Sequence, residues 1–312
     1  MIAIPDIGGA KAPGYSDADT PPPRCGHVAI IGRPSVGKST LLNALLSQKL
    51  SITSNKPQTT RHRITGILTE KDAQFIFVDT PGFQTLHRSR LNERLNRAVR
   101  ESLAQVDVVV LVLDAARIVA ADREVIALLP SDVAVIAALN KTDRLKDTSV
   151  LLPRLAEVTQ LHPFTALIPV SAEKGTQLTA LKAEIARALP EEAPIYPADH
   201  LTDRDERFLA AEFIREKIFR LLGDEVPYAT TVGIDSLVQE GDLRRIRATV
   251  YVAKTGQRGM VLGESGLRMK AIASQARADM ERLFGGRVFL EVWVRVKPKW
   301  AESDQSLTRY GY

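Results

Sequence analysis

A glycine-rich loop between an apolar strand and a helix carries the clearest chemical signal in the sequence. Residues 32–39 read GRPSVGKS, which fits the phosphate-binding pattern GxxxxGK(S/T). In that setting, successive backbone N–H groups and the helix N-terminus point at the phosphates of a nucleotide. Lys38 can then reach the β- and γ-phosphates, and the Ser39 hydroxyl can hold Mg²⁺. The predicted phosphate-binding residues are Gly32, Arg33, Pro34, Ser35, Val36, Gly37, Lys38, Ser39 and Thr40.

A second motif follows a buried strand downstream of this loop. The sequence DTPG at 79–82 ends the apolar run 74–78. The pattern DxxG is weak by itself, because residues 6–9 near the N-terminus match it as well. At the end of a strand, however, Asp79 can reach Mg²⁺ through a water molecule, and the Gly82 N–H can meet a γ-phosphate.

Two later motifs predict the pocket for the base. Residues 140–143 read NKTD and follow the strand 133–139, and Ser171-Ala172 follows the strand 166–170. An aspartate carboxylate accepts two N–H bonds from the guanine edge, which adenine cannot offer. Four motifs in this order, each at the carboxyl end of a strand, predict a guanine-nucleotide site. The nucleotide-binding residues they add are Asp79, Gly82, Asn140, Lys141, Asp143, Ser171 and Ala172.

A polar loop at 58–63 lies where a switch segment is expected, between the first helix and the next strand. A threonine hydroxyl there can complete the Mg²⁺ shell only when the γ-phosphate is present, and we favour Thr60 over Thr59. Ras-like GTPases have a glutamine after the DxxG motif that orients the attacking water, whereas this chain has Phe83. We therefore expect slow intrinsic hydrolysis; Phe83 can equally be an apolar anchor for the second switch. The predicted catalytic residues are Lys38, Thr60 and Gly82, and the predicted metal ligands are Ser39, Thr60 and Asp79.

Strands and helices alternate from residue 26 to residue 190, which predicts a mostly parallel sheet with helices on both faces. Prolines then mark a linker, after which the expected order is α-β-β-α-β, with a glycine-punctuated loop before the second helix at 266–283. The predicted parts are a disordered arm at 1–24, an α/β P-loop domain at 25–190, a linker at 191–202, a small α+β domain at 203–300 and a tail at 301–312.

Charge is concentrated in one C-terminal segment. The chain has a net charge of +5, but residues 254–300 hold ten basic and four acidic residues, and the remainder is close to neutral. This asymmetry is typical of a nucleic-acid surface, although a solvated helix face would look the same. The single cysteine excludes a disulfide within the chain. The longest apolar run, 108–113, is far shorter than the roughly 20 residues of a membrane span.

The basic segment contains a GxxG turn at the head of a predicted helix. Such a turn brings backbone close to RNA phosphates, and the adjacent apolar groove takes unstacked bases. The same pattern occurs at 256–259, but the position at 263–266 favours the second copy. The predicted RNA-binding residues are Gly263, Glu264, Ser265, Gly266, Arg258, Arg268 and Lys270.

Together these motifs resemble the Era family of bacterial GTPases. The sequence QTTRHR at 58–63, with the C-terminal domain behind it, is specific to that family, and the run 289–297 resembles its type II KH domain. The resemblance covers residues 25–312. It implies GTP/GDP and Mg²⁺ as cofactors, binding of the 3′ end of 16S ribosomal RNA, and a role in assembling the small ribosomal subunit. It also implies a cytoplasmic protein with peripheral association to the inner membrane.

Two positions depart from the family pattern. Ser35 stands where the family usually has an asparagine, which helps some relatives to hold a monovalent cation. The sequence therefore leaves open whether a potassium ion (K⁺) binds beside the phosphates. Glu264-Ser265 replaces the usual basic residue of the KH turn, and we expect Arg258, Arg268 and Lys270 to compensate.

Two other interpretations compete with a hydrolytic switch. The chain could be an RNA-binding assembly factor in which GTP is a structural ligand and turnover is negligible. A metabolic NTPase or kinase is disfavoured by the NKTD motif. We expect a monomer with no DNA partner, and we expect His62 and His87 to lie on the surface.

Overall fold

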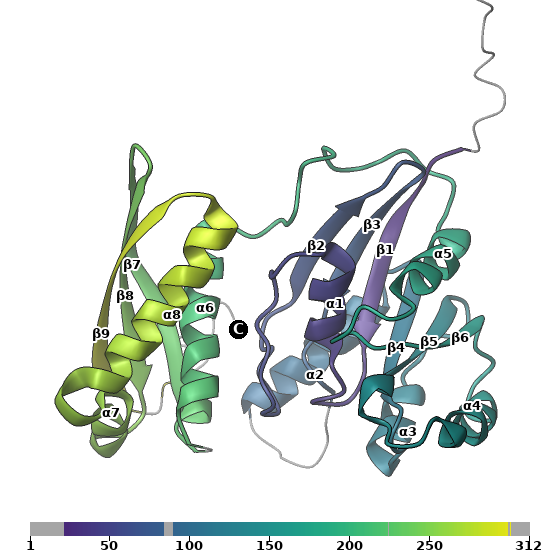
Figure 1. The fold of residues 1–312 in the computed structure, drawn as a ribbon, viewed down its shortest axis with the longest axis horizontal. Coiled ribbons are helices and arrows are strands. Elements are labelled where there is room, and N and C mark those ends of the chain that lie inside the picture. Colours follow the sequence, from purple (N-terminus) through teal and green to yellow (C-terminus); the bar gives the residue numbers. More distant parts are fainter. Residues whose placement is uncertain (1–21, 84–89, 224, 299, 301–312) are drawn as a thin grey trace, which may run out of the picture.

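The computed structural model describes residues 22–83, 90–223, 225–298 and 300, which form two sheets with packed helices (Figure 1). The first sheet contains strands β1 (Arg24–Ile31), β2 (Ile64–Thr69), β3 (Ala73–Asp79), β4 (Val108–Asp114), β5 (Ala134–Asn140) and β6 (Ala166–Pro169). Their order is β2-β3-β1-β4-β5-β6, and only β2 runs antiparallel to its neighbour. Because parallel strands end at one edge, the four predicted motif loops meet there.

Helices cover both faces of this sheet. Apolar side chains of α1 (Lys38–Leu46) and α5 (Leu178–Ala188) pack on one face, and those of α2 (Arg90–Leu103), α3 (Ala120–Ile126) and α4 (Leu151–Thr159) pack on the other. Strand β4 is buried along nearly its whole length, as a strand with helices on both sides must be. The predicted α/β domain with a mostly parallel sheet is confirmed.

The second sheet has the order β7-β8-β9, with β7 antiparallel to β8 and β8 parallel to β9. Helices α6 and α8 lie between this sheet and the first domain, so the sheet forms the far side of the molecule (Figure 1). The elements of this domain are α6 (Glu206–Leu221), β7 (Thr230–Glu240), β8 (Leu243–Val252), α7 (Thr255–Leu262), α8 (Leu267–Phe284) and β9 (Arg287–Val296).

The predicted α-β-β-α-β order is wrong in one element, because α7 replaces the expected glycine-punctuated loop. Each glycine inside a helix costs about 1 kcal/mol relative to alanine, so Gly256 and Gly259 argued against a helix. Two features outweigh that cost. The Gln257 side chain accepts a hydrogen bond from the Lys254 N–H at 2.9 Å, and Val261 is fully buried. The domain is therefore α-β-β-α-α-β.

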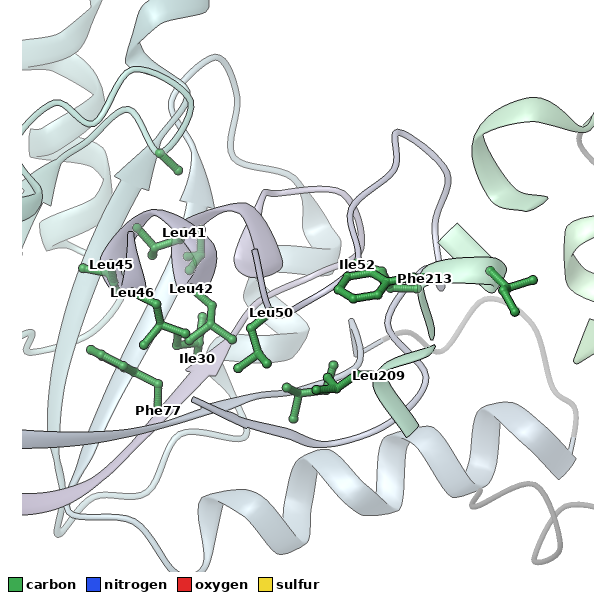
Figure 2. Packing of buried hydrophobic residues seen from close by; sticks show 14 of the residues in the cluster. Ile30, Leu41, Leu42, Leu45, Leu46, Leu50, Ile52, Phe77, Leu209 and Phe213 are labelled. Atoms are coloured by element: carbon green, nitrogen blue, oxygen red, sulfur yellow. The ribbon is translucent and has the colours of Figure 1, made fainter. Parts of the chain in front are cut away.

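One apolar cluster crosses the boundary between the two domains. Leu50 and Ile52, which follow α1, belong to the same buried cluster as Leu209 and Phe213 of α6. Figure 2 shows Ile52 beside the Phe213 ring and Leu50 facing Leu209. The segment that leads from α1 toward the predicted switch loop is thus packed against the second domain.

Hydrogen bonds hold the predicted linker and the residues next to it against the first domain. The Gln74 side chain accepts hydrogen bonds from the backbone N–H groups of Ile195 and Tyr196 and donates one to the Tyr196 carbonyl. The Ile67 N–H donates to the Leu201 carbonyl at 2.8 Å. Within the described ranges, no helix combines the length and apolar composition that crossing a bilayer requires.

Candidate GTP and RNA sites

The glycine-rich loop is shaped by positions that only glycine tolerates. Gly37 has φ of 103°, and a Cβ there would lie 2.4 Å from the Asn140 amide nitrogen. Lys38 follows as the first residue of α1, and its ammonium donates to the carbonyls of Gly32 and Arg33 at 3.0 Å each. Burial lowers the pKa of Lys38 from 10.5 to about 8, although nearby Asp79 opposes the shift. The loop thus holds one cation beside a row of backbone donors.

Three oxygen-bearing side chains meet beside this loop. The Ser39 hydroxyl donates to Asp79 Oδ2 at 2.7 Å and lies 2.7 Å from the Thr60 hydroxyl. Asp79 is fully buried, and its Oδ1 has no hydrogen-bond partner among the residues that the structure describes. Burial raises the pKa of this carboxyl, against hydrogen bonds from Ser39 and Ser51 that lower it. Hydroxyl and carboxylate oxygens with one free lone-pair site fit Mg²⁺.

The structure separates the two candidate threonines of the switch loop. The Thr59 hydroxyl is turned away, donating to the Lys56 carbonyl and lying 2.6 Å from the Ser54 hydroxyl. The Thr60 hydroxyl instead reaches Ser39. The choice of Thr60 therefore agrees with the geometry. Ser51 also reaches Asp79, at 3.0 Å, a contact that no sequence motif indicated.

Asn140 connects three of the motif loops. Its amide nitrogen donates to the Val36 carbonyl at 2.9 Å, and its amide oxygen accepts the Ala172 N–H at 3.0 Å. The Lys141 ammonium donates to the Ser35 carbonyl at 2.7 Å and also bonds Asp114. Asn140 and Lys141 thus fix the phosphate loop against the base pocket.

Asp143, the residue predicted to select the base, is exposed beside Ser171. Its carboxylate accepts a hydrogen bond from the Ser171 hydroxyl at 2.5 Å, which orients it. A cleft of about 620 Å³ runs past Lys141 and reaches Gly37 and Thr40 in the phosphate loop. The cleft therefore joins the phosphate loop to the NKTD motif, and the other two motifs end at the same edge of the sheet.

Three further residues of this region have positions that sequence alone left open. Gly82 packs so closely on the phosphate loop that a Cβ would lie 2.7 Å from Pro34 Cα. Phe83 is 4% exposed in the core beside α2, with the Arg100 guanidinium over its ring. Phe83 is therefore an apolar anchor. Arg33 turns away from the site, because its guanidinium donates to the buried Asp122 carboxylate.

The expectation that His62 lies on the surface is wrong. His62 is 8% exposed, lies 3.9 Å from the Glu212 carboxylate and contacts the Phe208 ring edge-on. Both partners belong to α6, so this burial arises from contact between domains. His87 lies outside the described residues.

The GxxG turn lies between α7 and α8, as a short 3₁₀ turn at Glu264–Gly266. Gly263 has φ of 70°, and a Cβ there would meet Arg268 Cβ at 2.6 Å. Gly266 and Ser265 also have left-handed φ values, 77° and 49°. The turn is therefore tightly wound, and its two central residues, Glu264 and Ser265, are exposed. The predicted basic residues Arg258, Arg268 and Lys270 are exposed on the two helices that flank it.

A buried ion-pair cluster at the domain boundary was missed by sequence reasoning. Glu216 of α6 is fully buried and binds the ammonium groups of Lys49 and Lys217 at 2.5 and 2.8 Å. Asp279 of α8 binds the same two lysines at 2.5 Å. Glu216 also accepts the Thr53 N–H, at 3.0 Å. The segment between α1 and the switch loop is therefore tied to the second domain.

Comparison with known proteins identifies the two domains. A family model described as "50S ribosome-binding GTPase" matches residues 27–141, and a KH domain model matches residues 225–301. The GTPase Era of Chromobacterium violaceum is 52% identical over 290 residues, covering 93% of this chain and 98% of that protein. The GTPase Era of Neisseria meningitidis is 50% identical over 290 residues, covering 92% and 94%.

Solved structures give the same result. An Era variant from Aquifex aeolicus bound to GDP and AlF₄⁻ aligns with a TM-score of 0.89 at 36% identity, covering 93% of this chain and 99% of that one. Era in complex with MgGDPNP and nucleotides 1506–1542 of 16S ribosomal RNA aligns with the same TM-score, identity and coverage. This chain, with its GTPase domain and C-terminal KH domain, belongs to the Era family of GTPases.

Proposed function

We propose that this GTPase is a switch that binds the 3′ end of 16S ribosomal RNA through its KH domain and assists assembly of the small ribosomal subunit. The observation that carries the proposal is the meeting of Thr60 with Ser39 and Asp79, since Thr60 belongs to a loop that the KH domain also contacts. Arg61, the next residue, donates to the carbonyls of Pro227 and Thr230 in the KH domain. A change of the bound nucleotide that moves Thr60 can therefore be transmitted through Arg61 to the KH domain.

In this proposal each residue of the nucleotide site has one role. Backbone N–H groups of the loop 32–39 bind phosphate oxygens, and the Lys38 ammonium binds the β- and γ-phosphates. Ser39, Thr60 and, through water, Asp79 hold Mg²⁺, which when bound offsets negative charge on the phosphates. The Gly82 N–H meets the γ-phosphate, and Asp143 selects guanine. Because Phe83 is buried and apolar, the side chain at position 83 does not orient the attacking water.

The RNA roles follow the same reasoning. We assign the backbone of residues 263–266 to the phosphates of the bound strand, with Arg258, Arg268 and Lys270 supplying positive charge beside it. Glu264 opposes that charge, and the three basic residues offset it. The domain limits proposed here are 25–190 for the GTPase domain and 203–300 for the KH domain, joined by the linker 191–202.

A second candidate function is an RNA-binding factor in which GTP is a structural ligand with negligible turnover. Phe83 favours it, because a buried phenylalanine cannot orient water. The two candidates make different predictions for turnover, and both predict RNA binding.

RNA binding can be tested with the 1506–1542 fragment and the full-length protein. We expect tighter binding with the non-hydrolysable analogue GDPNP than with GDP, measured by fluorescence anisotropy of labelled RNA. The Arg268→Glu/Lys270→Glu double variant should weaken RNA binding strongly while GDP affinity stays unchanged. Equal RNA affinity of the double variant and the unaltered protein would refute the assigned RNA site.

A further inference from the structure

The KH sheet has helices on one face only, and the other face is exposed. No element of the described chain covers that face, which lies on the side away from the GTPase domain (Figure 1). Trp293 is 60% exposed and Phe289 is 46% exposed, both on β9. Large exposed apolar side chains that gather on one surface mark interaction sites. We call this surface the outer sheet face; the side chains considered on it are Arg245, Arg247, Arg287, Phe289, Glu291, Trp293 and Arg295.

Two aromatic rings lie between two arginines along β9. Its outward positions read Arg287, Phe289, Glu291, Trp293 and Arg295, while the positions between them face the helices. At about 3.3 Å per residue, the two ring positions are roughly 13 Å apart along the strand. Each ring therefore has an arginine two positions away on its strand.

The neighbouring strand β8 adds two further arginines. Arg245 lies opposite Phe289 in the register, and Arg247 lies opposite Glu291. The Arg245 guanidinium stacks over the Phe289 ring, 5.4 Å from its centre. A flat guanidinium on an aromatic ring is a surface on which a nucleobase can stack. A hollow of about 470 Å³ opens beside this pair, lined also by Ser236 and Val238 of β7.

The charge balance of the face is slightly positive. Its four arginines are opposed by the carboxylates of Glu240, Glu291 and Asp235, and Asp235 accepts a hydrogen bond from Thr249, which lies opposite Trp293. Arg245 is paired with Glu240 at 2.7 Å and Arg247 with Glu291 at 3.0 Å. Arg287 and Arg295 are exposed and form no ion pair with any described residue. Likewise, no described cation or ring lies over the Trp293 indole. The face thus offers two unpaired cations and an uncovered indole, which together suit unstacked bases and their phosphates.

The face is continuous with the predicted RNA site. The turn 263–266 joins α7 and α8, and both helices pack against β9. Strand β9 is an edge strand, with the helices on one side of it and the outer sheet face on the other. A strand of RNA that leaves the turn across β9 therefore arrives at Phe289 and Trp293.

We propose that the outer sheet face is a second RNA-binding surface, which takes single-stranded or splayed-out bases of the RNA whose other part lies at the turn 263–266. Phe289 and Trp293 stack with bases, and Arg287 and Arg295 bind phosphates. This proposal rests on the proposed RNA function but concerns a different surface.

Two RNA probes separate the surfaces: the 1506–1542 fragment and a transcript of the whole 16S ribosomal RNA. The Phe289→Ala/Trp293→Ala variant should bind the whole transcript at least about tenfold more weakly, since the two base–ring stacks lost together are worth that much or more. Trp293→Phe should retain most of the affinity, because it keeps a ring. Leu152→Ala is the matched control, since Leu152 is 76% exposed on α4 of the GTPase domain and should have no effect.

Tryptophan fluorescence gives a second readout that does not depend on stability. The chain has two tryptophans, and the other, Trp300, is 1% exposed. Stacking of a base should quench Trp293 when the whole transcript binds, and the quenching should disappear in Trp293→Phe.

The outcomes are distinct. Unchanged affinity of the Ala variant for the transcript, together with unchanged fluorescence, would overturn the proposal and leave the turn 263–266 as the RNA site. Loss of binding to a ribosomal protein without loss of RNA binding would assign the face to a protein partner and also overturn it. If the unaltered protein bound neither RNA, the proposed RNA function would fail first.

Discussion

Glu216 is the residue whose replacement tests the link between the two domains most directly. Its carboxylate is fully buried and binds Lys49 and Lys217 as well as the Thr53 N–H. We predict that Glu216→Gln, which keeps the size but removes the charge, lowers the free energy of unfolding by about 3 kcal/mol. Breaking a buried pair by removing one partner costs about 3–5 kcal/mol, and the amide oxygen can still accept the Thr53 N–H, so the lower value applies.

The pH dependence of stability gives a second, independent consequence. Burial raises the pKa of Glu216, but hydrogen bonds from Lys217 and Lys49 outweigh it, so the pKa lies below the ordinary 4.5. A carboxyl whose pKa is lower in the folded state stabilises the fold above its ordinary pKa, and the contribution is lost as the pH falls further. The difference in stability between the unaltered protein and Glu216→Gln should therefore be full at pH 7 and shrink below pH 4.5.

Thermal unfolding followed by circular dichroism at pH 7 and at acid pH measures both effects. A loss of about 3 kcal/mol corresponds to a melting temperature lower by about 6 °C or more. The matched control is Glu240→Gln, because Glu240 forms an exposed pair with Arg245 that should contribute less than about 1 kcal/mol. If Glu216→Gln were as mild as the control at pH 7, the buried cluster would not join the domains in the way described.

Three further predictions concern the nucleotide site. Lys38→Ala should lower GTP turnover at least about 100-fold by removing the cation at the β- and γ-phosphates, measured by phosphate release, and full turnover would exclude this assignment. Asp143→Asn should weaken GTP binding at least about tenfold and favour XTP, because the amide can donate to the xanthine carbonyl; an unchanged preference in competition titrations would remove the argument for guanine. Gly37→Ala should abolish binding of a fluorescent GDP analogue, since its Cβ would lie 2.4 Å from the Asn140 amide; retained affinity would show that the loop can shift.

The sequence could predict that the four motifs lie at one edge of the sheet, because each motif is local. A phosphate loop, DxxG, NKTD and Ser171-Ala172 each follow a strand, and parallel strands bring their carboxyl ends to one edge regardless of the remaining packing. Once the strands were recognised, the geometry of the site required little else. The choice of Thr60 also depended only on where the loop must lie.

The features that sequence reasoning missed depend on contacts between distant segments. Helix α7 forms in spite of Gly256 and Gly259 because Val261 is buried against the sheet, a tertiary gain that local propensity cannot reveal. Nothing in the sequence around His62 or Glu216 distinguishes them from exposed polar residues. The contact of the switch loop with α6 buries His62, whereas Glu216 is buried with Lys49 and Thr53, which precede that loop. No pattern within either segment indicated these contacts.

GTP turnover in the presence and absence of RNA tests the central claim most directly. Purified full-length protein should hydrolyse GTP slowly by itself and faster with the 1506–1542 fragment, in potassium or in sodium buffer. A higher rate in potassium would show that Ser35 permits a K⁺ site beside the phosphates. Turnover that stayed at background in every buffer, with RNA bound, would contradict the switch and leave an RNA-binding factor with GTP as a structural ligand.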